Sequence, residues 1–122
     1  MTGTRKIHVL IVDDDPLTRL MASEALRESG YSSVEAEDGL RALALFDTER
    51  PDLVLMDLKM PVMDGYEATR LIRAEAPTAP LVVMSAFAYE GDIERAYEAG
   101  CTDYVTKPVD GKELLAKIEA LG

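Results

Sequence analysis

Short apolar runs alternate with amphipathic stretches along the chain. The runs are continuous in hydrophobicity and rich in Val, Leu and Ile, which is typical of strands buried on both faces. The run in the second position is the weakest. We expect five strands, at residues 7–12, 32–36, 52–57, 80–86 and 102–107.

Between these strands the apolar residues recur at helical spacing. This spacing predicts helices over residues 16–28, 39–49, 92–99 and 111–121. A further helix is expected to follow a loop at residues 59–65 and to run to about residue 74. Asp15 is expected to cap the first helix, with Pro16 in its first turn, and Asp64 to act as a cap and turn residue.

The helical spacing also assigns faces to the helices. In the first helix one face carries Leu17, Leu20, Met21 and Ala25. In the second helix we expect Leu40 and Ala44 to point inward, together with Leu43 and Phe46.

Five strands that alternate regularly with helices predict an α/β fold. The arrangement is a doubly wound (βα)5 unit, in which a five-stranded parallel sheet is covered on both faces. The sequence shows no internal repeat and no interdomain linker, and 48% of its residues are hydrophobic, enough for one core. We therefore predict one domain over residues 1–122.

The charge of the chain excludes two classes of partner. Thirteen Lys and Arg residues stand against 23 Asp and Glu residues, for a net charge of −10. A basic face, which direct nucleic-acid binding or attachment to anionic lipid requires, is not expected.

The single cysteine suits a reducing compartment, and the run at 7–12 is too short for a signal peptide or a membrane span. We expect a cytoplasmic location.

Polar residues that can carry chemistry follow the predicted strands. Asp13 and Asp14 come after the first strand, Asp57 ends the third, Ser85 ends the fourth and Lys107 ends the fifth. In open parallel sheets, ligands bind beyond the carboxyl ends of the strands, where the winding reverses. We expect these side chains to converge if the first and third strands are neighbours.

Converging carboxylates need a compensating charge. Two of them about 4 Å apart repel by roughly 4 kcal/mol at an effective dielectric near 20. A hard divalent cation offsets this repulsion, and carboxylate oxygens suit Mg²⁺ better than Zn²⁺. Lys107 could balance the charge of a phosphoryl group, Ser85 could donate to it, and a carboxylate facing the cation could accept it as a nucleophile.

Four segments carry a resemblance to a known family: VLIVDDDP, PDLVLMDLKMPVMDGYEATR, VVMSAFA and DYVTKP. Together, in this order and spacing, they resemble the receiver domain of two-component response regulators over nearly the whole chain. The resemblance implies the flavodoxin-like strand order 2-1-3-4-5, as in chemotaxis receivers.

The resemblance implies a phosphoacceptor and a metal site. Asp57 stands where receivers accept a phosphoryl group from a phosphohistidine. Asp13 and Asp14 stand where receivers hold Mg²⁺, with Asp14 as the direct ligand and Asp13 acting partly through water. The backbone carbonyl of Lys59 would complete the metal site.

Other matching positions concern the switch. Ser85 is the hydroxyl residue, Lys107 is the phosphate-binding lysine, and the Lys107–Pro108 bond resembles the cis-proline of the family. Tyr104 matches the aromatic residue that reports the active state. Lys59 and Phe87 occupy variable flanking positions that influence how fast water removes the phosphate.

As a receiver, the protein would be a signalling module and no enzyme beyond its own phosphotransfer and autodephosphorylation. Phosphorylation would switch the surface formed by the fourth helix, fifth strand and fifth helix. The implied partners are a histidine kinase or a histidine phosphotransfer protein, and a downstream protein target. We expect a monomer or a weak phosphorylation-dependent dimer, and the length suits a stand-alone regulator as well as a piece of a longer protein.

Two other functions use similar residues. A haloacid-dehalogenase-type phosphohydrolase would place its nucleophile on the first strand in a D-x-D-x-T/V pattern, whereas here Asp13-x-Asp15 is followed by Pro16 and Leu17. A flavodoxin-like cofactor binder needs a phosphate loop rich in Ser, Thr and Gly after that strand. The sequence there is DDDPLT, whose carboxylates would repel a flavin phosphate.

Overall fold

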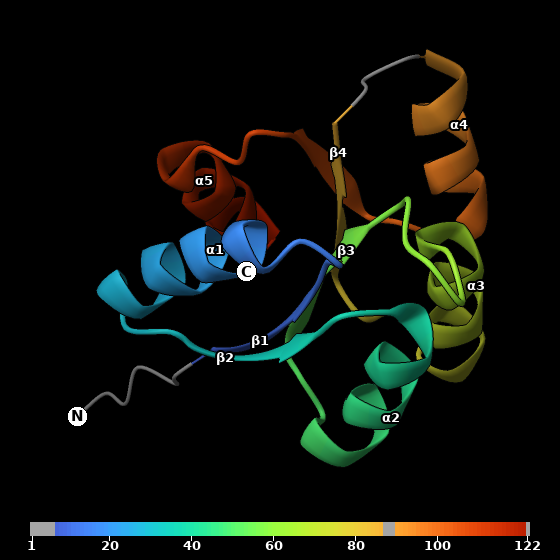
Figure 1. Ribbon diagram of the computed structural model, residues 1–122, viewed down its shortest axis with the longest axis horizontal. Coiled ribbons are helices and arrows are strands. Elements are labelled where there is room, and N and C mark those ends of the chain that lie inside the picture. The colour runs from blue at the N-terminus through green and yellow to red at the C-terminus, as the bar shows by residue number, and fades with distance from the viewer. Residues whose placement is uncertain (1–6, 87–89, 122) are drawn as a thin grey trace.

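The fold is a parallel five-stranded sheet between two layers of helices (Figure 1). The computed structural model describes residues 7–86 and 90–121. Its elements, in chain order, are β1 (His8–Val12), α1 (Pro16–Glu28), β2 (Ser32–Ala36), α2 (Gly39–Glu49), β3 (Leu53–Asp57), α3 (Gly65–Glu75), β4 (Leu81–Ser85), α4 (Glu90–Ala99), β5 (Asp103–Thr106) and α5 (Gly111–Leu121). All ten predicted elements are confirmed, with ends that differ from the predicted ones by at most two residues.

The strand order is β2-β1-β3-β4-β5, which confirms the predicted topology. All neighbouring strands run parallel. Val12 is opposite Met56, and Asp57 is opposite Met84, so β1, β3 and β4 end at nearly the same level. The winding reverses between β1 and β3, and the acidic residues that follow these two strands therefore lie side by side.

The strands bury alternate residues in two separate cores. Leu10 and Val12 belong to the core under α2, α3 and α4, whereas Val9 and Ile11 belong to the core under α1 and α5. Figure 1 shows these two helix layers on opposite sides of the sheet. Because both faces are covered, the three central strands β1, β3 and β4 are apolar at all but one position each, as the continuous runs predicted.

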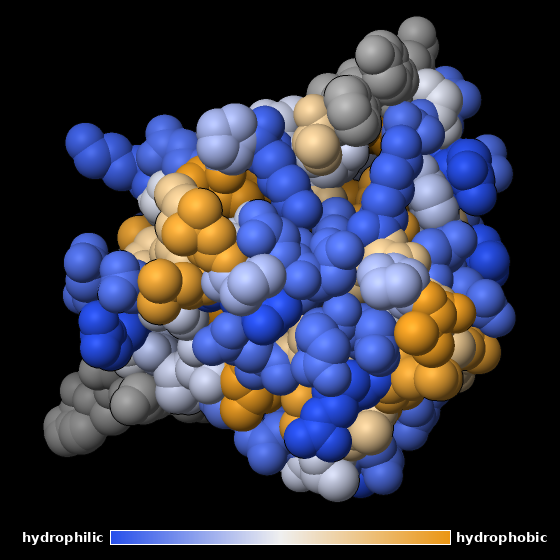
Figure 2. All heavy atoms as spheres, viewed as in Figure 1, coloured by the Kyte–Doolittle hydropathy of each residue, from blue (hydrophilic) through white to orange (hydrophobic). Residues whose placement is uncertain are grey.

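The structure shows which helix faces are buried, and it corrects the predicted inward face of α2. In α1, Ala22 and Leu26 face the sheet, while Leu17 is 60% exposed and belongs to an apolar patch with Leu20 and Met21 (Figure 2). In α2, Ala42 and Phe46 are buried, and the predicted inward residues Leu40 and Ala44 are exposed. Periodicity finds an apolar stripe, but the neighbouring elements decide which stripe meets the sheet.

The predicted caps are confirmed. The side chain of Asp15 accepts a hydrogen bond from Leu17 N at 3.1 Å, and that of Asp64 accepts one from Glu67 N at 2.9 Å. Each cap satisfies a backbone donor that the first helical turn leaves unpaired.

Within the described residues, no helix is both long and apolar enough to cross a membrane.

The loop between β3 and α3 contains a strained turn. Val62 has φ of 68° and is 74% exposed, and Met63 N donates to Pro61 O at 2.8 Å across it. This is a γ-turn with positive φ at its centre, a rare conformation for a β-branched residue. Such a residue costs about 1–3 kcal/mol, and strain of this kind concentrates near functional sites.

Candidate functional site

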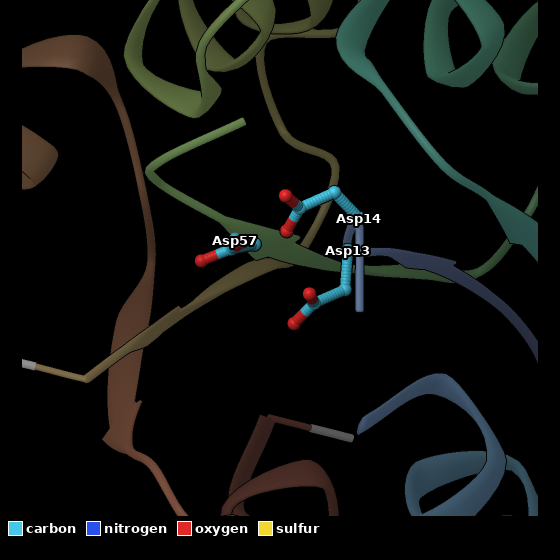
Figure 3. Close-up of side chains that lie close together, drawn as sticks. All are labelled: Asp13, Asp14 and Asp57. Atoms are coloured by element: carbon cyan, nitrogen blue, oxygen red, sulfur yellow. The ribbon is translucent and has the colours of Figure 1, made fainter. Parts of the chain in front are cut away.

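Three carboxylates meet where β1 and β3 end. Asp13, Asp14 and Asp57 each offer an oxygen atom, and these oxygens all lie within 4.8 Å of one another (Figure 3). Asp13 is fully buried, Asp57 is 5% exposed, and Asp14 is exposed. The parallel register of β1 and β3 therefore produces the convergence predicted from the sequence.

Lys107 lies directly against two of these carboxylates. Its Nζ is 2.7 Å from Asp13 Oδ2 and 3.2 Å from Asp57 Oδ1. The backbone helps to place it, since Lys107 N donates to Ser85 O at 2.8 Å. The Lys107–Pro108 peptide bond is cis, as the resemblance implied. Lys107 thus pairs with two of the three clustered carboxylates, and this cluster keeps an excess of negative charge.

The remaining predicted site residues surround the corner where Asp13, Asp14, Asp57 and Lys107 meet, at different depths below the surface. Ser85 is 7% exposed and pairs with Thr106 across β4 and β5. Lys59 is exposed and lines, with Asp14, a hollow of about 490 Å³ that opens beside the carboxylates. Phe87 lies outside the described residues.

Tyr104 lies away from the carboxylates, between α4 and α5. Its ring meets the edge of Tyr97 with the centroids 6.4 Å apart. Lys117 Nζ is 5.2 Å from the centroid of Tyr104 and also 3.1 Å from Asp103 Oδ1. The aromatic side chain predicted to report the state therefore forms part of the surface predicted to transmit it.

The electrostatics of the corner shift the pKa values of two groups. Burial, followed by repulsion from Asp13, raises the pKa of Asp57 from 3.8 to about 6, although Lys107 opposes the change. Burial alone would lower the pKa of Lys107, but the carboxylates of Asp13 and Asp57 outweigh it and the pKa is raised. At neutral pH the Asp57 carboxylate is ionised and Lys107 is protonated.

The donor set suits a hard divalent cation. The ligand atoms are carboxylate oxygens, which Mg²⁺ and Ca²⁺ prefer. Asp13 Oδ2 is buried and accepts no hydrogen bond from the described residues, although it is ion-paired with Lys107. A buried acceptor with spare lone pairs beside two further carboxylates is consistent with a cation held at this corner.

One residue that holds this site, Arg19, was not predicted from the sequence. Arg19, on α1, donates from Nη1 to the backbone carbonyl of Asp13 at 2.6 Å and from Nε to Glu35 Oε1 at 3.1 Å. Its place one turn after the Asp15 cap was the only available signal, because the partner is a backbone atom that sequence patterns do not reveal.

Comparison with known proteins decides the family. A family model described as the response regulator receiver domain matches residues 9–119. The chain belongs to this family. The protein is therefore a receiver domain of the two-component type, and the phosphohydrolase and flavodoxin-like alternatives are set aside.

Individual relatives agree with this assignment. The transcriptional regulatory protein CseB of Streptomyces coelicolor is 42% identical over 93% of this chain. The chemotaxis protein CheY4 of Vibrio cholerae superposes with a TM-score of 0.92 at 28% identity, over 97% of this chain and all of that one. The receiver domain of the sensor histidine kinase PA1611 of Pseudomonas aeruginosa, solved with a magnesium ion in its active-site cleft, has a TM-score of 0.88 at 34% identity and covers 96% of this chain and 98% of its own.

The lengths of the relatives differ. This chain covers 48% of CseB, so it spans about half the length of the first curated relatives that it matches. The receiver domain is accordingly the part that these longer regulators share with this chain.

Proposed function

We propose that Asp57 is the phosphoryl acceptor of this receiver domain and that Asp13, Asp14 and the carbonyl of Lys59 hold Mg²⁺ beside it. The observation that carries the proposal is the meeting of three carboxylates with one lysine at the ends of β1, β3 and β5. The magnesium ion in the related receiver domain of PA1611 supports the choice of metal.

The phosphotransfer step follows from these positions. An ionised carboxylate oxygen of Asp57 attacks the phosphorus of a phosphohistidine, an O–P bond forms, and the P–N bond breaks with imidazole as leaving group. Lys107 balances charge on the phosphoryl oxygens, and the Ser85 hydroxyl donates a hydrogen bond to one of them. Bound Mg²⁺ would neutralise further charge and so admit an anion to an acidic corner.

We assign the output to the surface formed by α4, β5 and α5. Tyr104 packs between Tyr97 of α4 and Lys117 of α5, so a rotation of its ring changes both contacts. A hydrogen bond from Ser85 to the phosphoryl group would favour one orientation of the Tyr104 ring over the other. A downstream protein would bind the surface with the ring in one of these two orientations.

We assign the phosphodonor to a histidine kinase or a histidine phosphotransfer protein. Leu17 and Met21 are exposed and line a groove with Lys107, Pro108 and Val109. An apolar patch beside the lysine that balances the phosphoryl charge is a suitable docking surface for a protein donor.

We propose that residues 1–122 form one domain that contacts no nucleic acid directly. We further propose that this domain works in the cytoplasm, where ATP supplies the phosphoryl group to the donor kinase. We assign it no catalytic turnover beyond its own phosphorylation and dephosphorylation, and a monomeric or weakly dimeric state.

Intact mass spectrometry with a small phosphodonor tests the proposal. The protein is incubated with phosphoramidate, with and without Mg²⁺, as the wild type, Asp57→Asn and Asp15→Asn. Asp15→Asn is a matched control, because it removes an acid from the same loop while asparagine still caps α1.

We expect one hydroxylamine-labile phosphoryl group on the wild type and on Asp15→Asn, and only with Mg²⁺. Asp57→Asn should gain none, because an amide is not a nucleophile here. Equal labelling of Asp57→Asn would show that another residue is the acceptor.

A further inference from the structure

The Asp13 residue is held at each of its polar atoms. Its backbone N–H donates to Ala36 O at 3.1 Å, and its Oδ1 accepts from Asp15 N at 2.8 Å. Its Oδ2 lies against Lys107. Its carbonyl oxygen accepts the 2.6 Å hydrogen bond from Arg19 Nη1.

The Arg19 side chain joins three elements. It extends from α1, contacts the end of β1 through the Asp13 carbonyl, and contacts β2 through Glu35. Its side chain is only 18% exposed. A planar guanidinium can make both contacts at fixed angles, and lysine, with a single ammonium, cannot reproduce this geometry.

The carbonyl that Arg19 binds belongs to the peptide bond between Asp13 and Asp14. That peptide is planar, so a hydrogen bond to its oxygen fixes the plane and with it the starting position of the Asp14 side chain. The Asp14 side chain itself is exposed, so packing inside the protein does not fix its carboxylate. The position of this carboxylate therefore depends on its backbone.

We infer that Arg19 is a positioning residue for the cation site, acting through the Asp13–Asp14 peptide. The inference rests on the proposed function, in which Asp14 is a ligand of Mg²⁺. Groups that orient metal ligands in this way change metal affinity by about 10- to 100-fold when they are removed.

Charge alone would have the opposite effect. A cation close to the site repels Mg²⁺, so removal of Arg19 would strengthen metal binding if charge were its main contribution. Glu35 Oε1, 3.1 Å from Arg19 Nε, compensates that charge. The sign of the change in Mg²⁺ affinity therefore separates positioning from electrostatics.

The test is calorimetric titration of the metal-free protein with MgCl2, well below the thermal midpoint of each variant. The variants are Arg19→Met, which keeps the apolar stem, Arg19→Lys, which keeps the charge, and Glu35→Gln, which removes the compensating charge. Thermal unfolding in EDTA and the amide NMR shift of Asp14 are recorded in parallel.

We expect Arg19→Met to weaken Mg²⁺ binding about tenfold and to shift the Asp14 amide, with Arg19→Lys in between. Glu35→Gln should change the affinity by less than about threefold, since it leaves the carbonyl hydrogen bond in place. Unchanged or tighter Mg²⁺ binding by both Arg19 variants would overturn the inference. If the wild type bound no Mg²⁺, the proposed metal site would fail, and this inference with it.

Discussion

Asp57 is ionisable, almost buried and close to another acid. Burial and the neighbouring Asp13 raise its pKa to about 6, and Lys107, 3.2 Å away, limits the rise. An ionised Asp57 is therefore costly for the folded protein at neutral pH, and a bound cation would relieve this cost. The repulsion between the carboxylates destabilises this part of the folded protein, and the same negative charge favours binding of a divalent cation.

This pKa predicts how stability depends on pH in the absence of metal. Between about pH 4 and pH 6 the unfolded chain has released this proton while the folded protein still holds it. The contribution of Asp57 to the free energy of unfolding therefore falls as pH rises through this range. Asp57→Asn removes the contribution and should be more stable than the wild type at pH 7.

Urea unfolding of both proteins in EDTA, at intervals from pH 4 to pH 7.5, measures this difference. The advantage of Asp57→Asn should be small near pH 4 and should grow until about pH 6. A difference that stayed constant over the whole range would show that the pKa of Asp57 is not raised.

At the scale of elements, the ends of the strands bring the chemistry together. Asp57 is the last residue of β3, and the chain returns at once to begin α3 at Gly65. Gly65 N donates to Leu58 O at 2.9 Å, and a Cβ atom at this position would lie 1.9 Å from the Asp57 carbonyl oxygen. The helix can therefore approach the end of β3 only because residue 65 has no side chain.

Gly65→Ala should destabilise the protein by about 3 kcal/mol, because the methyl group collides with backbone that cannot move independently of Asp57. It should also slow phosphoryl labelling of the folded protein. Urea unfolding and the mass assay measure the two effects.

Gly91→Ala is the matched control. Gly91 also lies in the first turn of a helix, but no atom of the described residues 7–86 and 90–121 lies within 4 Å of the Cβ atom that alanine would add. This variant should be more stable than the wild type, by up to about 1 kcal/mol, because alanine is the better helix former. Similar losses in both variants would contradict a specific close contact at Gly65.

At the scale of the whole molecule, two cores hold one sheet from opposite sides. The carboxylate site is joined to both cores, since β1 and β3 contribute residues to each of them and carry the acidic residues at their ends. Any ion that binds only the folded arrangement must therefore stabilise the entire domain by mass action.

Magnesium should accordingly raise the free energy of unfolding by about 2.7 kcal/mol at a concentration 100 times its dissociation constant. The effect should be much smaller in Asp14→Asn, and NaCl at equal ionic strength should not reproduce it in the wild type. Thermal unfolding over a range of MgCl2 concentrations measures this. An equal response to NaCl would indicate general screening of the net charge of −10 instead.

The sequence by itself determined the elements, their order and the chemical character of the site. Continuous apolar runs between amphipathic stretches specify strands buried on both faces, and Asp15 and Asp64 specify helix starts. Polar residues at the strand ends indicated the corner, because parallel strands all end on the same side of a sheet.

Only the tertiary structure decided which faces are buried and how the site is held. Leu17 and Met21 have the spacing of a core stripe, but α1 packs against the sheet through Ala22 and Leu26 and leaves them exposed. The hydrogen bond from Arg19 to the Asp13 carbonyl joins a side chain to a backbone atom. Such contacts depend on how helices sit on a sheet, and periodicity along one chain carries no information about that distance and angle.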